Sequence, residues 1–212
     1  MTETATEGRV ARRQKKKRTA LISAARQVMS EKGVAATTML EIAELADVGA
    51  GTVYNYFKSK DEIAVAVLEV LMHELAVRIE TITDQFEDPA QVYAFGIRTV
   101  LDTATTDPRW EQMLHRTEVI ADAMFRMMGP FAIRDLRLAS QAGRFRVSNP
   151  ELVWRLTTYA ITGAAHSITQ GDTAPESKNL VIARLLCMTG IDLDGASELA
   201  ARPRPALPPE TR

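Results

Sequence analysis

Polar side chains suited to binding a polyanion gather in one short segment near the N-terminus. They supply hydroxyl, amide and ammonium groups, and they are Thr52, Tyr54, Asn55, Tyr56 and Lys58. Such groups donate hydrogen bonds to phosphate oxygens, and the amide of Asn55 can also pair with the edge of a base. Val53 and Phe57 lie four residues apart in the same segment, which predicts a short helix with one buried side and one polar, exposed side.

Charge is distributed unevenly along the chain. Residues 9–60 carry 11 Lys and Arg against 4 Asp and Glu, a net charge of +7, whereas residues 61–212 carry 15 against 21, a net charge of −6. A basic head on an acidic body indicates a polyanion that binds the head alone. A solvated basic tail is the alternative that charge by itself leaves open.

Helix-capping residues and the spacing of apolar residues predict the helices that position these side chains. Four helices are predicted, over about residues 16–32, 38–46, 50–57 and 59–82. Gly33 is a typical residue to end the first, and Thr38 with Glu41 forms a capping-box pattern that begins the second. Ser59 is placed to cap the fourth.

The second and third of these helices have the properties of a helix-turn-helix. Ile42, Ala43 and Ala46 are predicted to face inward, and the two alanines allow the helices to cross closely. Val48 is expected to fill the turn. A helix-turn-helix presents its second helix to the major groove of DNA, which here is the helix that carries the polar side chains.

The segment Met39–Lys60 resembles the DNA-binding domain of the TetR/AcrR family of bacterial regulators. The matching pieces are Thr37-Thr38, Ile42-Ala43-x-x-Ala46, Val48, Gly51-Thr52-Val53-Tyr54-x-Tyr56-Phe57 and Ser59-Lys60-Asp61-Glu62. Many positions agree at fixed spacing, and the resemblance extends over roughly residues 15–72. The remainder of the chain resembles the family only in its long helices.

The resemblance implies a role for each matching position. Contacts to phosphates are implied for Thr38, Thr52, Tyr56 and Lys60, with Lys58 beside them. Tyr54 and Asn55 are implied to lie at or near base edges, where Gly51 allows close approach. The basic run Arg12–Arg18, with Arg18 nearest the domain, is implied to lie along the DNA backbone or in the minor groove.

Two residues depart from the family pattern. Asp47 stands in the turn where the family usually has glycine, and Asp tolerates a left-handed backbone better than most residues but less well than glycine. Gly49 stands where serine often caps the third helix, and glycine is an acceptable cap. We expect a slightly less stable turn and the same fold.

The predicted fold class is all-α, with about nine helices and no sheet. Further helices are expected to begin at Pro89, Pro108, near Gly129-Pro130, at Asn149-Pro150 and at Pro175. The predicted organisation is a disordered tail over 1–8, a DNA-binding domain over 9–62 with its helix-turn-helix at 38–57, an effector-binding and dimerisation domain over 63–197, and a Pro-rich tail over 198–212.

The family resemblance implies a homodimer that pairs through the last two long helices. The sequence is compatible, because Leu152, Leu156, Ala160 and Gly163 lie on one broad face of the segment 151–170. The apolar segment 177–188 is expected to be buried nearly all round. An ordinary monomer core is the alternative.

A ligand pocket for a small apolar or aromatic effector is expected between the helices that follow the DNA-binding domain. The predicted lining residues are Phe95, Trp110, Met113, His115, Met124, Phe125 and Trp154. Methionines clustered over 113–128 would provide an adaptable apolar wall. The alternative for each residue is that it only fills the core.

Other chemistry is poorly supported. The three histidines lack metal-ligand spacing, no paired carboxylates suggest acid–base catalysis, and there is no phosphate-binding loop or nucleophile elbow. We therefore predict no enzyme activity, no cofactor and no metal. A single cysteine, Cys187, and the lack of an apolar stretch of about 18 residues indicate a cytoplasmic protein without a membrane span.

The predicted function is a ligand-responsive repressor that binds a palindromic operator as a dimer. A transcriptional activator, or a regulator without a small ligand, is the first alternative. An enzyme built on a helical bundle is the second.

Overall fold

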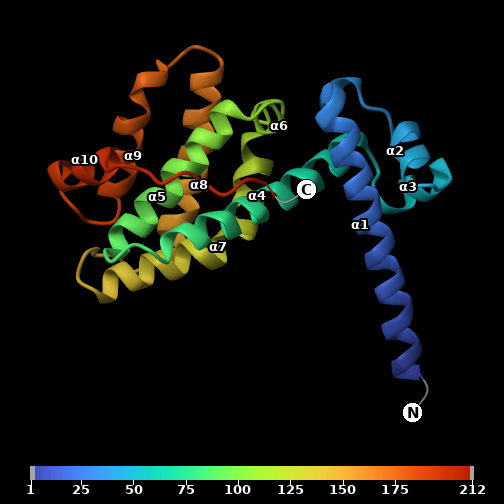
Figure 1. Ribbon diagram of the computed structural model, residues 1–212, viewed down its shortest axis with the longest axis horizontal. Helices are drawn as coiled ribbons and strands as arrows, with labels where there is room; N and C mark the ends of the chain where they lie inside the picture. Colours follow the sequence, from blue (N-terminus) through green and yellow to red (C-terminus); the bar gives the residue numbers. More distant parts are fainter. Residues whose placement is uncertain (1–2, 211–212) are drawn as a thin grey trace. The chain divides into compact units, whose positions relative to one another are not determined.

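The computed structural model describes residues 3–210 and, within them, contains ten α-helices, one 3₁₀ turn and no strand (Figure 1). The predicted all-α class is confirmed. The chain divides into two compact units, the first ending at Leu68 and the second beginning at Glu69. No helix in the described part of the chain is both long and apolar enough to cross a membrane.

The first unit holds α1 (Glu3–Ala36), α2 (Met39–Leu45), α3 (Ala50–Tyr56) and the beginning of α4 (Lys60–Thr83). α1 starts well before the predicted residue 16, so residues 3–8, for which we expected disorder, are helical, whereas residues 1 and 2 lie outside the described part. Gly33 interrupts α1 with a φ of 81°, as expected for a residue that ends a helix.

Buried side chains from all four helices form the core of this unit. They are Leu21, Ala25, Val28, Ile42, Ala43, Val53, Phe57, Ile63 and Ala64. Val53 and Phe57 are completely buried, so the predicted apolar side of α3 is confirmed. Burial of each of the Leu, Ile, Val and Phe side chains stabilises the fold by about 1.5–3 kcal/mol, which fixes α3 on the other three helices.

The turn between α2 and α3 is a Schellman motif. The N–H of Val48 donates to the carbonyl of Ala43 at 3.0 Å, and the N–H of Asp47 donates to the carbonyl of Glu44 at 3.1 Å. Asp47 is left-handed, with a φ of 52°, at the position where this motif favours glycine. The predicted strain at Asp47 is therefore present, and the turn still forms.

The second unit contains the rest of α4 and the helices that follow it. Their bounds are α5 (Pro89–Thr106), α6 (Pro108–Glu111), α7 (Thr117–Gln141), α8 (Pro150–Thr169), α9 (Lys178–Cys187) and α10 (Leu193–Ala201), with a 3₁₀ turn at Pro175–Ser177. α7 packs along α8, α5 packs against both, and α9 packs on α10.

Local start signals place most of these helices correctly. Pro89 and Pro108 begin α5 and α6, and the side chain of Asn149 caps α8. Pro130 is different, because it lies inside α7 rather than at the start of a helix. A proline inside a helix forfeits one backbone hydrogen bond, and the apolar face that α7 continues on both sides of Pro130 outweighs that loss.

The C-terminal segment 203–210 has no helix or strand and lies along the second unit (Figure 1). Arg98 donates to the carbonyl of Arg202 at 2.9 Å, and Arg78 donates to the carbonyl of Pro208 at 2.7 Å. Arg109 forms an ion pair with Glu210 at 2.6 Å. Residues 198–201 of the predicted Pro-rich tail belong instead to α10, whereas residues 203–210 are extended, as their composition suggests, and are held to α4, α5 and α6.

Candidate nucleic-acid interface and ligand cavity

The exposed face of α3 carries most of the side chains predicted to contact DNA. Tyr54 is 49% exposed, and Gly51, Asn55 and Lys58 are exposed as well. Thr52 and Tyr56 are half-buried at the edges of this face. Because Val53 and Phe57 anchor the opposite side, the polar face is held rigidly toward solvent.

Gly51 leaves the backbone of α3 open on this face. A Cβ atom added at Gly51 would meet no other heavy atom within 4 Å. The fold therefore does not require glycine at this position. The open space at Gly51 is compatible with a close approach of another molecule to the backbone of α3.

The lysines beside α3 are engaged in local bonds. Lys58 Nζ donates to the carbonyl of Tyr54 at 3.2 Å, and Lys60 Nζ donates to the carbonyl of Ala35 at 2.6 Å. Lys60 thus binds the C-terminal end of α1. A phosphate contact from Lys60 would have to replace that bond.

Cations on α1 extend the polar surface of the first unit. Arg18 is exposed and its guanidinium lies 5.0 Å from the centre of the Phe57 ring, at the end of α3. All of the cations from Arg9 to Lys17 are exposed. The basic run therefore faces solvent along its whole length.

Thr38 caps α2 through the predicted capping box. Its hydroxyl accepts from the N–H of Glu41 at 3.3 Å, and the carboxylate of Glu41 accepts from the N–H of Thr38 at 2.9 Å. Glu41 also forms an ion pair with Lys32 of α1. The hydrogen bond from Lys32 and those from Thr38 lower the pKa of Glu41 from 4.5 to about 2.

We expect the Glu41 carboxylate to stabilise the first unit in a pH-dependent way. A carboxyl group whose pKa is lowered by folding stabilises the fold above its unfolded pKa. That contribution is lost as pH falls from 4.5 toward 2. Glu41→Gln should therefore melt at a lower temperature than the unmodified protein at pH 7, and the two melting temperatures should approach each other as pH falls from 4.5 to about 2. A difference that persists unchanged to pH 2.5 would contradict this assignment.

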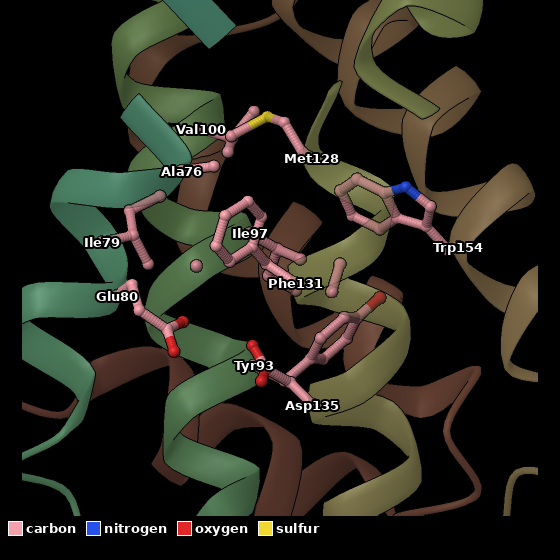
Figure 2. A pocket seen from close by; sticks show the side chains of 12 residues that line it. Ala76, Ile79, Glu80, Tyr93, Ile97, Val100, Met128, Phe131, Asp135 and Trp154 are labelled. Atoms are coloured by element: carbon pink, nitrogen blue, oxygen red, sulfur yellow. The ribbon is translucent and has the colours of Figure 1, made fainter. Parts of the chain in front are cut away.

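The second unit contains a small cavity of about 30 Å³ that is lined mainly by apolar side chains (Figure 2). Its walls come from α4, α5, α7 and α8, and the lining residues are Ala76, Ile79, Glu80, Tyr93, Gly96, Ile97, Val100, Met128, Phe131, Ala132, Asp135 and Trp154. The space is small, so a ring-sized ligand would require side chains of the lining to move.

One end of this cavity is polar. Asp135 is 8% exposed and accepts from Arg134 Nη2 at 2.7 Å, and the same guanidinium binds Glu80 of α4 through two hydrogen bonds of 2.5 and 2.6 Å. Burial raises the pKa of Asp135, and Arg134 partly opposes that change. Figure 2 shows Tyr93 and Asp135 side by side at this end, and the Tyr93 hydroxyl lies 3.0 Å from the Thr157 hydroxyl.

Trp154 forms the opposite wall. The indole packs against Gly129, where an added Cβ would lie 3.4 Å from Nε1. The Nε1 atom is buried and has no hydrogen-bond partner among the residues that the structure describes. Trp154 thus adds an aromatic wall to a cavity that also contains the Asp135 carboxylate.

Only Trp154 among the seven predicted ligand residues lines this cavity. Trp110, Met113 and Met124 are buried elsewhere, and His115 is exposed. Phe95 packs edge-on against Phe86. Phe125 lies under the guanidinium of Arg155, 3.7 Å from its ring centre.

The sequence prediction did not include the polar lining residues Glu80, Tyr93 and Asp135. For Asp135 a signal was present in the helix pattern. Met128, Phe131 and Asp135 follow one another at helical spacing, so an acidic residue occupies the apolar face of α7. Tyr93 has no comparable signal, because a tyrosine on an apolar helix is an ordinary core residue.

One face of α8 is apolar and exposed in the protomer. Leu152 is 53% exposed, Leu156 is 50% exposed and Tyr159 is 41% exposed, and the smaller Ala160 and Gly163 continue the same face. On α9, Leu180 is 56% exposed, whereas Ile182, Leu185 and Leu186 are buried. The expectation that the segment 177–188 is buried nearly all round therefore fails for Leu180 within one protomer.

Comparison with known families and curated proteins finds matches in both units. The family described as bacterial regulatory proteins, tetR family, matches residues 21–67, and the tetracyclin repressor-like C-terminal domain matches residues 88–202. The HTH-type transcriptional regulator HbdR of Aromatoleum sp. (strain CIB) is 39% identical over 71 residues, which are 32% of this chain and 31% of HbdR. An uncharacterized HTH-type regulator of Bacillus subtilis (strain 168), YhgD, is 38% identical over 55 residues, 26% of this chain and 29% of YhgD. The chain thus matches less than a third of the length of these relatives.

Solved structures match over nearly the whole chain. RolR in complex with resorcinol has a TM-score of 0.84 and 28% identity, over 93% of this chain and 100% of RolR. RolR without ligand has a TM-score of 0.77 and 28% identity, over 90% of this chain and 100% of RolR. FadR of Bacillus subtilis in complex with stearoyl-CoA shares the fold alone. It has a TM-score of 0.54 and 18% identity, over 86% of this chain and 96% of FadR.

These matches confirm the resemblance that the segment Met39–Lys60 predicts, and they identify a family of regulators rather than of enzymes. Because the C-terminal family match alone spans more than half of the chain, the protein belongs to the TetR family of bacterial transcriptional regulators.

Proposed function

We propose that the protein is a repressor that binds a palindromic operator as a homodimer and releases it when a small hydroxylated aromatic molecule binds. The observation that carries the proposal is the polar, exposed face of α3, held in place by the buried Val53 and Phe57. The proposed DNA-binding domain is the first unit, and the proposed effector and dimerisation domain is the second. The proposed location is the cytoplasm, where bacterial operators are.

The proposed DNA contacts follow the predicted roles, weighted by exposure. Tyr54 and Asn55 are assigned to base edges, and Gly51 to close approach. Thr52, Tyr56, Lys58 and Arg18 are assigned to phosphates. Thr38 and Lys60 are assigned to phosphates as well, but with a smaller contribution to DNA binding. Their side chains already form hydrogen bonds in the capping box and with the end of α1.

The proposed dimer forms through the exposed face of α8 together with Leu180 of α9. A row of exposed leucines beside Ala160 and Gly163 supports this choice, since small residues allow two helices to approach closely. Dimerisation also fits the proposed operator, because two helix-turn-helix heads read two half-sites.

The proposed effector is a small ring with hydroxyl groups. Two features of the cavity support this class: the aromatic wall of Trp154, and the buried Asp135 carboxylate that can accept from a hydroxyl. RolR, to which the chain is similar over nearly its whole length, was solved with resorcinol, a dihydroxybenzene. Resorcinol is therefore the first compound to test.

The proposed switch acts through Arg134. This guanidinium joins Asp135 at the cavity to Glu80 on α4, and α4 is the helix through which the chain passes from the first unit to the second. A ligand hydroxyl that donates to Asp135 competes with Arg134 for the carboxylate. That competition changes how Arg134 binds Glu80 on α4. The ligand shifts the equilibrium only by its difference in affinity for the two states.

The direct test is binding of the purified protein to the DNA upstream of its own gene, followed by fluorescence anisotropy with and without resorcinol and related phenols. We expect specific binding that weakens steeply with salt and is reversed by at least one hydroxylated ring. Absence of specific binding would contradict the repressor proposal. Specific binding that no compound reverses would favour the ligand-independent alternative, and transcription that rises with bound protein would favour an activator.

Asp135→Asn should weaken effector binding roughly 10- to 150-fold, because a hydrogen bond to a charged group contributes about 1.5–3 kcal/mol. Quenching of Trp154 fluorescence on titration with the effector provides the measurement. Asp84→Asn removes an exposed carboxylate from the same unit and is the matched control, for which we expect no change. Equal affinities for both variants would exclude Asp135 as the hydroxyl acceptor.

A further inference from the structure

A second cavity, of about 230 Å³, lies in the second unit and shares no residue with the first. It is bounded by α5, by the 3₁₀ turn and start of α9, and by the C-terminal segment. Its lining residues are Arg98, Leu101, Asp102, Pro175, Glu176, Lys178, Asn179, Ile182 and Arg204. Polar and charged side chains dominate this cavity, in contrast to the apolar walls around Trp154.

Three cations from three different elements meet at this cavity. Arg98 belongs to α5, Lys178 begins α9, and Arg204 comes from the C-terminal segment. Asp102 binds two of them, since Lys178 Nζ lies 3.3 Å from Oδ1 and Arg204 forms an ion pair with Oδ2. Glu176, the other acidic residue of the lining, is exposed.

Arg98 lacks a carboxylate partner of its own. Its Nη1 donates to the carbonyl of Arg202, and the guanidinium makes no ion pair within the part of the chain that the structure describes. Burial and the neighbouring Arg204 lower the pKa of Arg98, although Asp102 opposes them. The repulsion between Arg98 and Arg204 is the cause that an added negative charge between them would relieve.

We propose that this cavity binds a phosphate group, either free phosphate or the phosphate of a small metabolite. A guanidinium offers two parallel N–H donors to an oxyanion, and an ammonium adds a compact positive charge from another direction. Donors that approach from three elements fit a tetrahedral anion. The cavity leaves room beyond the phosphate for a small organic group. Because Arg204 belongs to the C-terminal segment, a bound phosphate would also fasten that segment to α5 and α9.

The test is the thermal melting of the full-length protein in potassium phosphate and in potassium chloride of equal ionic strength, with calorimetry for the dissociation constant. We expect phosphate to raise the melting temperature by about 3–6 °C at ten times its dissociation constant. Arg98→Gln should abolish that rise, and Lys178→Gln provides a second variant if Arg98→Gln fails to fold. Inorganic phosphate and a phosphate monoester are tested side by side. The compound that binds more tightly identifies the source of the phosphate group.

The basic head of the protein requires a matched control, because it also attracts anions. Lys16→Gln removes an exposed cation of α1 and should keep the full phosphate-dependent rise. A rise that is lost in Lys16→Gln but retained in Arg98→Gln or Lys178→Gln would overturn the proposal. An equal effect of chloride and phosphate on the unmodified protein would also overturn it. Neither outcome depends on operator binding, so the result stands apart from the proposed repressor function.

Discussion

Gly51→Ala is expected to leave the protein folded and to weaken operator binding at least about tenfold, the effect of roughly 1.4 kcal/mol. The added methyl group meets nothing within 4 Å in the free protein. Alanine also favours a helix over glycine by about 0.8–1 kcal/mol, so the melting temperature should hold or rise. Weaker binding would then arise from a clash with DNA and not from damage to the fold. Anisotropy at one fixed salt concentration and a melting curve provide the two measurements.

Asn55→Ala tests the recognition of bases separately from the close approach of α3 to DNA. Loss of an amide that pairs with a base should reduce the preference for operator over random DNA about 5- to 150-fold, as expected for 1–3 kcal/mol of discrimination. Gln27→Ala, an exposed amide on α1 of the same unit, is the control and should change neither quantity. If Gly51→Ala and Asn55→Ala both bind the operator like the unmodified protein, α3 is not the reading helix.

Gly163→Glu is expected to convert the dimer to a monomer and to abolish operator binding at concentrations where the unmodified protein saturates it. Gly163 is exposed on α8, and an added Cβ meets nothing within 4 Å, so one protomer accommodates the change. In the proposed dimer the new carboxylate would be buried without a partner, which costs several kcal/mol. Sedimentation velocity and anisotropy measure the two consequences.

Gln141→Glu adds the same charge at an exposed position at the end of α7 and should leave the dimer intact. This control distinguishes a specific interface from general repulsion between acidic bodies. A dimer that persists in Gly163→Glu would place the pairing surface elsewhere on the protomer.

The helices could be predicted where their signals are local. Thr38 with Glu41, Pro89 and Asn149 act within three residues of the helix start that they mark, so sequence spacing was sufficient. Pro130 gave the wrong boundary, because packing of α7 against α8 is a long-range property that overrides a local break. α10 was missed, since a nine-residue helix containing Gly195 has little periodicity and depends on packing against α9.

The polar face of α3 and the apolar cavity differ in how well the sequence predicts them, again because one depends on local signals and the other on long-range packing. The polar face of α3 arises from one segment of seven residues, so its residue types and spacing already separate the exposed from the buried side. The cavity instead joins α4, α5, α7 and α8, and no local pattern shows which apolar residues leave a space between them. Trp110 and Met124 fill the core, whereas Tyr93 and Phe131 line the cavity. Only the fold distinguishes the first pair from the second.

The most direct test of α3 as the reading helix is cleavage of the operator from a reagent attached to the helix itself. Cys187→Ser removes the single native thiol, and Asn55→Cys then carries a DNA-cleaving chelate on the exposed face of α3. We predict two clusters of cuts in the major groove, separated by one or more helical turns of about 10–10.5 base pairs. Gln27→Cys in the same background should give no clusters. An operator left uncut from position 55, or cut equally from position 27, would contradict the account.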